Sequence, residues 1–335
     1  MVEAAALIDE AVASGNLPGA VLATRNGVYA AGRLSTGGAP TTADTIFDLA
    51  SLTKVVATLP CVLHLVELGE IDLDDPVTRY VPAFDHGRTR VTLRHLLTHT
   101  SGLADSRPFH RSGNTPAERW RAVTKALLMT GPDTAMVYSD IGFLLLGLMV
   151  EAVTGAGLDD VAAKTVFEPL GMASTRYRPP ESWWSRCAAT EPDGNGVPKI
   201  GIVHDENAEA LGGVAGHAGL FGTAPDIARY IAAWIDPAAD LIRPDLRAEA
   251  LRCQTAHVGA RRGLGWALRG DRWDHMGSAW PQTGAGHTGF TGTSIGFDPP
   301  SGEWAVLLTN GVHLGRDGRT VIALRRAVHD AVAGA

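Results

Sequence analysis

Ser51 and Lys54 stand three residues apart, and a long apolar stretch follows them. In a helix of about 3.6 residues per turn, such positions share one face, so the hydroxyl and amino groups would be neighbours. A serine becomes a nucleophile when a base takes its proton, and a lysine whose pKa is lowered by burial can serve. The alternative is structural, with Ser51 as a helix cap and Lys54 as a solvated helix residue. The motif alone does not decide between them, because so short a pattern recurs by chance.

Two later segments add side chains that could act with this pair. Tyr138-Ser139-Asp140 precedes a second apolar helix, and His287-Thr288-Gly289 precedes Phe290 and a strand. A cation beside a tyrosine favours the phenolate, so Tyr138 and Lys54 could share the work of a base. The structural alternative makes Tyr138 a half-buried aromatic residue and Asp140 the cap of the helix at 141–153.

In this order and spacing, the three segments resemble the motifs of the serine β-lactamase and penicillin-binding protein superfamily. The likeness is to the class C β-lactamase and esterase branch, where a tyrosine begins the second motif, and it extends over residues 18–311. It implies an acyl-enzyme at Ser51, with Lys54 and Tyr138 also catalytic; Tyr138 would activate the deacylating nucleophile and protonate the leaving group. The implied oxyanion hole consists of the backbone N–H groups of Ser51 and Phe290. The implied substrate-binding residues are Asp140, His287, Thr288 and Gly289.

Two residues depart from the family pattern. Asp140 stands where the family usually has an asparagine that binds the substrate amide, and a carboxylate accepts hydrogen bonds without donating them. His287 stands where many members have a lysine, and a histidine is mostly neutral at pH 7. Both changes reduce the positive charge expected in the site, which weakens the case for substrates that carry a carboxylate.

The functional hypothesis is therefore a serine hydrolase acting on esters or amides of small molecules, a carboxylesterase or β-lactamase-like enzyme. The alternatives are an acyltransferase or thioesterase of a biosynthetic pathway, and a D-Ala-D-Ala carboxypeptidase-like peptidase. A non-catalytic binding module is disfavoured by the intact Ser51, Lys54 and Tyr138. The expected partner is a small-molecule acyl substrate, and the oligomeric state stays open.

Strand and helix patterns at both ends of the chain enclose a mostly helical middle. We expect an α/β (α+β) fold: an antiparallel sheet built from both termini and flanked by helices, with an inserted helical domain. The predicted sheet domain comprises residues 1–59 and 181–335, and the helical domain residues 60–180. Asn26-Gly27 predicts a hairpin between strands 20–25 and 28–33. Further strands are predicted at 264–268, 292–297 and 304–309, and helices at 3–14, 51–68, 93–97, 117–129, 141–153, 158–167, 225–235 and 319–332.

The bulk composition excludes several classes of protein. The 335-residue chain has a net charge of −7 and no basic stripe, which argues against nucleic-acid binding. Its densest basic pairs are Arg261-Arg262 and Arg325-Arg326. No secretory signal and no apolar run of about 18 residues stand out, so we expect a cytoplasmic protein without membrane association.

We predict neither a metal nor a cofactor. The three cysteines are far apart and form no CxxC pattern, which suggests buried free thiols. His204, Asp205, Glu206 and His217 match no standard zinc spacing, and such residues often order Gly-rich loops through local hydrogen bonds. We expect His99 to order the loop after its helix.

Overall fold

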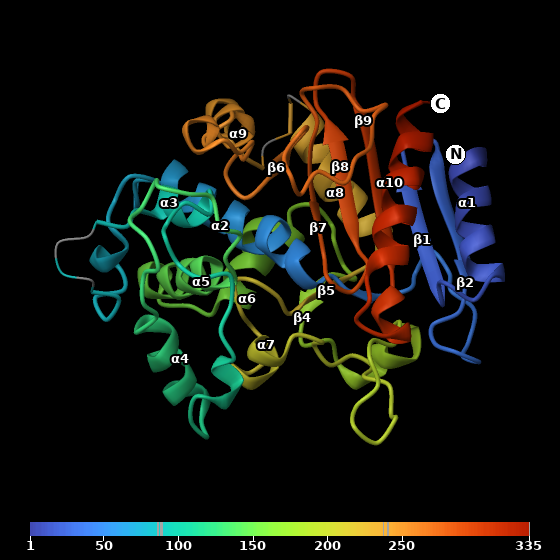
Figure 1. Ribbon diagram of the computed structural model, residues 1–335, viewed down its shortest axis with the longest axis horizontal. Helices are drawn as coiled ribbons and strands as arrows, with labels where there is room; N and C mark the ends of the chain where they lie inside the picture. Colours follow the sequence, from blue (N-terminus) through green and yellow to red (C-terminus); the bar gives the residue numbers. More distant parts are fainter. Residues whose placement is uncertain (86, 88–89, 237, 240, 335) are drawn as a thin grey trace.

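A six-stranded antiparallel sheet joins the two ends of the chain in this computed structural model, which describes residues 1–85, 87, 90–236, 238–239 and 241–334 (Figure 1). The strand order is β2-β1-β9-β8-β7-β6, so an N-terminal strand pairs with a C-terminal one at the middle of the sheet. The predicted sheet built from both termini is confirmed. Its strands are β1 (Gly19–Thr24), β2 (Gly27–Gly32), β6 (Ala267–Leu268), β7 (Ala285–Thr288), β8 (Ser294–Asp298) and β9 (Glu303–Thr309).

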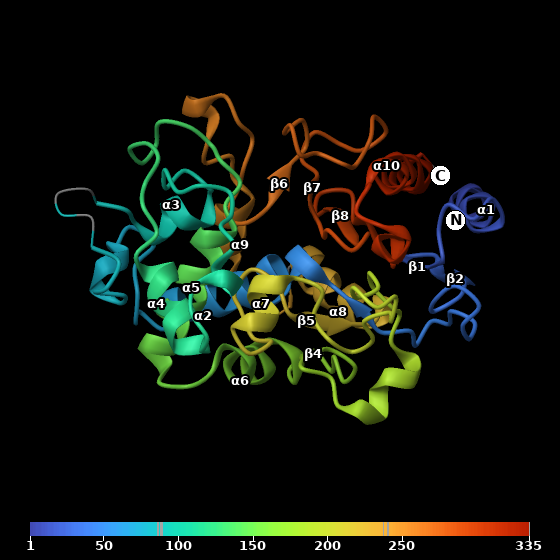
Figure 2. The same ribbon diagram turned by 60° about the horizontal axis from the view of Figure 1, so that its bottom comes forward.

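Helices cover both faces of this sheet. The terminal helices α1 (Val2–Ala13) and α10 (Arg319–Ala333) pack together on one face, and α8 (Ala224–Ile235) covers the other (Figures 1 and 2). Successive strand residues point to opposite faces, so Leu22 joins the core under the terminal helices while Val21 joins the main core. The central strands are therefore buried on both sides and give the site a rigid support.

The middle of the chain forms the predicted helical insertion, which lies on the side away from α1 and α10 (Figures 1 and 2). Its helices are α2 (Leu59–Glu67), α3 (Leu93–Leu97), α4 (Pro116–Thr124), α5 (Asp140–Thr154) and α6 (Leu158–Ala162). A small sheet in the order β3 (Phe47–Asp48), β5 (Leu220–Gly222) and β4 (Arg176–Tyr177) links the two parts. Because β4 falls within 60–180 and pairs with β5, the domain boundary at 180 stays a prediction.

The helix expected at 51–68 is irregular at its start, where Ser51 and Lys54 lie. It opens with a 3-10 turn at Ala50–Leu52 and a wide π turn at Lys54–Thr58, and only then becomes α2. Pro60 has no N–H to donate to the carbonyl of the preceding turn. The regular α-helical hydrogen bonds are therefore interrupted before Pro60, and the regular helix follows the π turn.

One helical segment of the described chain is long and apolar enough to resemble a membrane span, contrary to the expectation that no such run exists, and a bent pair of helices does so only when the two are taken together. The first, Ala50–Glu67, is 78% buried inside the protein and is a core helix. The second is the pair Asp140–Thr154 and Leu158–Phe167, which is bent by 80°.

Several predicted boundaries were wrong. The helix expected at 117–129 ends at Thr124, and the strand expected at 264–268 shrinks to two residues. The hairpin turn falls on Arg25 and Asn26, one residue before the predicted pair. The sequence analysis missed the short helices α7 (Glu206–Ala210) and α9 (Pro244–Leu251) and the short 3-10 segments at Val77–Arg79, Phe109–Arg111, Glu181–Arg186, Ala256–Val258 and Gly311–Leu314. The helix predicted at 158–167 is present as α6 and a π turn at Ala163–Phe167.

Candidate active site

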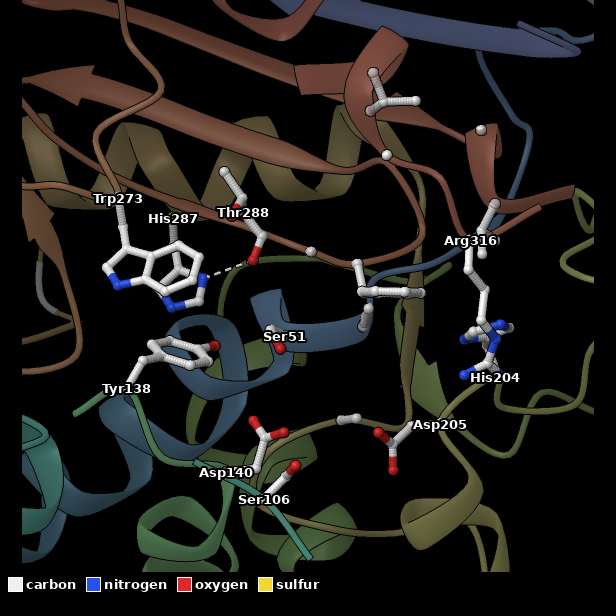
Figure 3. A pocket seen from close by; sticks show the side chains of 18 of the residues that line it. Ser51, Ser106, Tyr138, Asp140, His204, Asp205, Trp273, His287, Thr288 and Arg316 are labelled. Atoms are coloured by element: carbon white, nitrogen blue, oxygen red, sulfur yellow. Dashed lines mark hydrogen bonds between the residues drawn. The ribbon is translucent and has the colours of Figure 1, made fainter. Parts of the chain in front are cut away.

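A cavity of about 800 Å³ lies between the end of β7 and the helical part of the chain (Figure 3). The Tyr138 hydroxyl and the Asp140 carboxylate both point toward Ser51 in this cavity. Three segments that are distant in sequence therefore meet at one place. The predicted site residues that line it are Ser51, Tyr138, Asp140, His287, Thr288, Gly289 and Phe290.

The turn that carries Ser51 is held in a strained shape. Ala50, just before it, has a φ of +47°, a left-handed conformation that an L-residue rarely adopts. The Ala50 N–H donates to the buried carboxylate of Asp48 at 2.8 Å. Burial raises the pKa of Asp48, although the two main-chain N–H groups that it accepts from act in the opposite direction. Thr291 and Thr293 donate to the two carbonyls preceding Ala50, so the β7–β8 connection fixes the nucleophile turn.

Lys54 is completely buried, so the alternative of a solvated helix residue is wrong. Its Nζ lies 2.8 Å from the Ser51 Oγ, 3.1 Å from the His217 carbonyl oxygen and 2.8 Å from the Asp140 Oδ1. These three partners match the three N–H groups of an ammonium. The Ser51 hydroxyl therefore faces a protonated amine.

The charge of Lys54 is maintained by Asp140. Burial by itself would lower the pKa of Lys54, but the Asp140 carboxylate and then Tyr138 outweigh it and raise that pKa above its ordinary value. The expectation of a lowered Lys54 pKa is therefore wrong for the unliganded protein. The physical reason is the departure at position 140, because an asparagine there would bring no negative charge.

Tyr138 is half-buried, with aromatic rings and cations beside it. Its ring lies 4.5 Å from the ring of His99, with the Lys54 Nζ 5.0 Å and the Arg262 Cζ 5.6 Å from its centroid. The His99 Nδ1 accepts a 3.0 Å hydrogen bond from the N–H of Ser139, which orders the loop on which Tyr138 lies. Burial lowers the pKa of His99 well below its usual value, so His99 is neutral and can accept this bond.

Asp140 is free to face Lys54 because a neighbour caps the helix. The Ser139 hydroxyl accepts from the N–H of Gly142 at the start of α5, so the suggestion that Asp140 is the cap is wrong. Asp140 instead occupies the first helical position with its carboxylate toward the cavity.

His287 carries no positive charge in this setting. It is 3% exposed, and burial, followed by the charges of Lys54 and Arg262, lowers its pKa well below the usual value. Its Nδ1 lies 2.9 Å from the Thr288 carbonyl oxygen, so Nδ1 bears the proton and Nε2 is an acceptor. The predicted neutrality of His287 agrees with this geometry.

Sequence reasoning missed two buried arginines that line the cavity, Arg262 and Arg325. The Arg262 side chain is 2% exposed, and its Nε lies 3.4 Å from the buried Asp271. The prediction that the positive charge of the site is reduced was therefore incomplete. Each arginine belongs to one of the two densest basic pairs in the sequence, which is the signal that could have suggested them.

The amide of Phe290 is available for an oxyanion. Within the described residues, its N–H donates to no protein acceptor. The Phe290 side chain is 59% exposed at the cavity and stacks on the ring of His204, with centroids 5.7 Å apart. Its assignment to an oxyanion hole with Ser51 stays a prediction.

The histidines singled out as possible metal ligands form separate pairs. The His217 Nε2 lies 2.9 Å from Asp205, and the His204 Nε2 lies 3.1 Å from Glu191. Burial would raise the pKa of Asp205, but the charge and hydrogen bond of His217 keep it well below its usual value. Across the described part of the chain, no group of three or more His, Cys, Asp or Glu residues is arranged to hold a metal ion. The Asp205–His217 pair holds the segment whose carbonyl accepts from Lys54.

Comparisons with known proteins agree with this arrangement. The family model described as beta-lactamase matches residues 4–330. A protein of Salmonella enteritidis named "Putative D-alanyl-D-alanine carboxypeptidase" is 33% identical over 309 residues, which cover 81% of this chain and 71% of that protein. The structure of "EstCE1, a hydrolase with promiscuous acyltransferase activity" is 25% identical, with a TM-score of 0.80 over 98% of both chains. Simvastatin synthase (LovD) from Aspergillus terreus, at 20% identity, shares the fold with a TM-score of 0.78 over 99% of this chain and 98% of that one. The chain belongs to the beta-lactamase family of serine hydrolases.

Proposed function

We propose that this protein is a serine hydrolase that forms an acyl-enzyme at Ser51 with esters or amides of small molecules. The single observation that carries the proposal is the 2.8 Å contact between the Lys54 Nζ and the Ser51 Oγ at the wall of the cavity. A buried cation that donates to a serine oxygen stabilises the negative charge that develops there as the proton leaves.

The base in this proposal is Tyr138, because an ammonium at Lys54 has no lone pair to accept a proton. The Tyr138 oxygen, as a phenolate between the charges of Lys54 and Arg262, takes the proton of Ser51 while the Oγ attacks the carbonyl carbon. The resulting phenol gives this proton to the leaving atom when the acyl–leaving-group bond breaks. Tyr138 then takes a proton from water, whose oxygen attacks the acyl carbon, and returns it to the Ser51 Oγ. The reaction ends with the acid released and every proton restored.

The negative oxygen of each tetrahedral intermediate needs fixed donors. We assign this role to the N–H groups of Ser51 and Phe290, which lie on the strained turn at Ala50 and on the segment after β7. Both segments are tied together by Thr291 and Thr293, so the two donors are preorganised before substrate arrives.

A second candidate function is a D-Ala-D-Ala carboxypeptidase-like activity. Arg262 is the observation that favours it, since its cation lies beside Tyr138, where the leaving group would depart. A leaving group with a free carboxylate would find a positive partner there despite the neutral His287. The name of the Salmonella relative points the same way.

Intact-mass measurement after mixing with esters, thioesters, β-lactams and D-Ala-D-Ala peptides tests both candidates. We expect an acyl adduct on the wild-type protein and none on Ser51→Ala, whereas Ser106→Ala, a second serine of the cavity, should keep it. The substrate class that acylates fastest decides between the candidates. Undiminished turnover by Ser51→Ala would overturn the acyl-enzyme proposal, and adding an alcohol or amine acceptor would reveal acyl transfer as a new product mass.

A further inference from the structure

Arg325, on α10, contacts the peptide unit that supplies one donor of the proposed oxyanion hole. It is 7% exposed, and its Nη2 donates a 3.0 Å hydrogen bond to the Gly289 carbonyl oxygen. That oxygen and the Phe290 N–H belong to the same peptide group. The terminal helix therefore contacts the carbonyl of the peptide whose N–H is the oxyanion donor, through an arginine that also lies at the cavity wall.

The geometry of a trans peptide fixes the direction of this N–H. The C=O and N–H of one trans peptide point in opposite directions, and the described part of the chain contains no cis bond. With the Gly289 oxygen turned toward Arg325, the Phe290 N–H is turned away from it. Gly289 and Phe290 both line the cavity. The carbonyl oxygen also accepts from the N–H of Gly292 at 3.1 Å, which further restrains the peptide plane.

Arg325 has no counter-ion among the residues that the structure describes. Among the described residues, no carboxylate lies within ion-pair distance of its guanidinium, and its buried Nε has no hydrogen-bond partner. Burial lowers the pKa of Arg325 to about 10, which leaves it charged at neutral pH. His275, His287 and His329 are its titratable neighbours, and burial together with the Arg325 charge lowers their pKa values, so all three are neutral.

An unpaired buried cation destabilises a fold, because nothing replaces the hydration that it loses. Its retention beside the oxyanion peptide needs a reason other than stability. Among the described residues the charge has no anion, and one forms beside it when a substrate carbonyl oxygen at the Phe290 N–H becomes negative.

We propose that Arg325 is a positioning residue of the oxyanion hole, which holds the Gly289–Phe290 peptide with its N–H toward the reacting oxygen and strengthens that donor. This inference rests on the proposed acyl-enzyme function. A hydrogen bond at the carbonyl polarises the amide and makes its N–H a better donor, by roughly 10–30% per bond. In addition, the guanidinium charge acts on the oxyanion through a medium of low dielectric constant.

Three variants test the proposal on an ester that acylates the wild type: Arg325→Met, Arg325→Lys and, as matched control, Arg326→Met. Arg326 is the next residue on α10, and its Nη2 donates to the Asp274 carbonyl instead. Removing an oxyanion donor outright lowers kcat by about 10²–10³. Arg325 acts through such a donor, so we expect Arg325→Met to lower kcat by roughly 10- to 100-fold with KM changed less than about twofold. Arg325→Lys should recover part of this loss, and Arg326→Met should match the wild type.

Two further measurements separate this role from a structural one. The inhibition constant of an arylboronic acid, whose adduct with a serine is tetrahedral and negative, should rise in Arg325→Met by a factor similar to the loss in kcat. The melting temperature of Arg325→Met should equal or exceed that of the wild type, because a costly unpaired charge has gone.

An active wild type with an unaffected Arg325→Met would overturn this inference alone. The same conclusion follows if Arg325→Met loses stability in step with activity and Arg325→Lys restores only the stability. A wild type that forms no adduct at Ser51 would overturn the proposed function and this inference with it.

Discussion

Replacing Asp140 by asparagine tests whether Asp140 maintains the charge of Lys54. The substitution keeps the size of the side chain and removes only its negative charge. Lys54 would then sit completely buried with two neutral acceptors, the Ser51 Oγ and the His217 carbonyl. We expect its pKa to fall below the ordinary value, because burial, the largest influence on it, would no longer be opposed by Asp140.

The magnitude follows from removing the counter-ion of a buried cation, Lys54. Breaking such a pair costs about 3–5 kcal/mol of unfolding free energy at pH 7, less whatever Lys54 recovers by releasing its proton. In the wild type, the raised pKa of Lys54 gives stability that is complete below the unfolded value of 10.5 and is lost only above it. In Asp140→Asn, the pKa of Lys54 is lower in the folded protein than in the unfolded chain, so between these two values only the unfolded chain keeps the proton of Lys54. The free energy of unfolding therefore rises with pH up to 10.5, by at most about 1.4 kcal/mol per pH unit.

Urea unfolding of both proteins at pH 7, 8 and 9 measures this difference directly. The stability gap between wild type and Asp140→Asn should narrow as the pH rises. Asp159→Asn is the matched control, because Asp159 pairs with the exposed Arg178 and should cost less than about 1 kcal/mol at every pH. Parallel stability curves for wild type and Asp140→Asn would refute the idea that Asp140 controls Lys54.

Three other predictions concern stability. Burial lowers the pKa values of four histidines, which are His99, His275, His287 and His329. Their contribution to the free energy of unfolding should therefore be complete above pH 6.5, and the free energy should fall by roughly 5–6 kcal/mol when the pH is lowered to 5.5. A free energy of unfolding by urea that does not change with pH over this range would contradict this. Arg262→Met leaves the buried Asp271 without its cation and should cost about 3 kcal/mol, so its melting temperature should drop where that of Arg325→Met does not. Ala50→Gly relieves a left-handed residue and should leave the unfolding free energy equal or higher, whereas Ala57→Gly in the neighbouring turn should lose at least about 1 kcal/mol in the same assay.

Much of the fold could be predicted because turns and amphipathic helices depend on residues that are close together in the sequence. Asn26 and Gly27 indicate a turn by their own backbone preferences, and the hairpin forms within one residue of the prediction. The buried stripe of α10 follows from its spacing of apolar residues. By contrast, α9 has no strong apolar face and β6 pairs over only two residues, so neither has a clear local signal.

The electrostatics of the site could not be read from the sequence in the same way. Ser-x-x-Lys places Ser51 near Lys54, but the state of that lysine depends on Asp140, which another helix brings to 2.8 Å from it. Arg325 resembles any surface arginine of an amphipathic helix until packing buries it behind β7. Pairings of this kind arise from tertiary contacts, and a pKa shift is set by those contacts rather than by residue type.

The cations near Ser51 differ in whether they have a counter-ion before the reaction. Lys54 is paired with Asp140 and Arg262 faces Asp271, so part of the field of each is already balanced in the resting protein. Arg325 has no such partner among the described residues, and the peptide that it contacts provides the proposed oxyanion donor. Only interactions that are stronger in the transition state than in the ground state raise the chemical rate. A cation that meets its anion only when the tetrahedral oxyanion forms satisfies that condition, which is why Arg325 should affect kcat far more than KM.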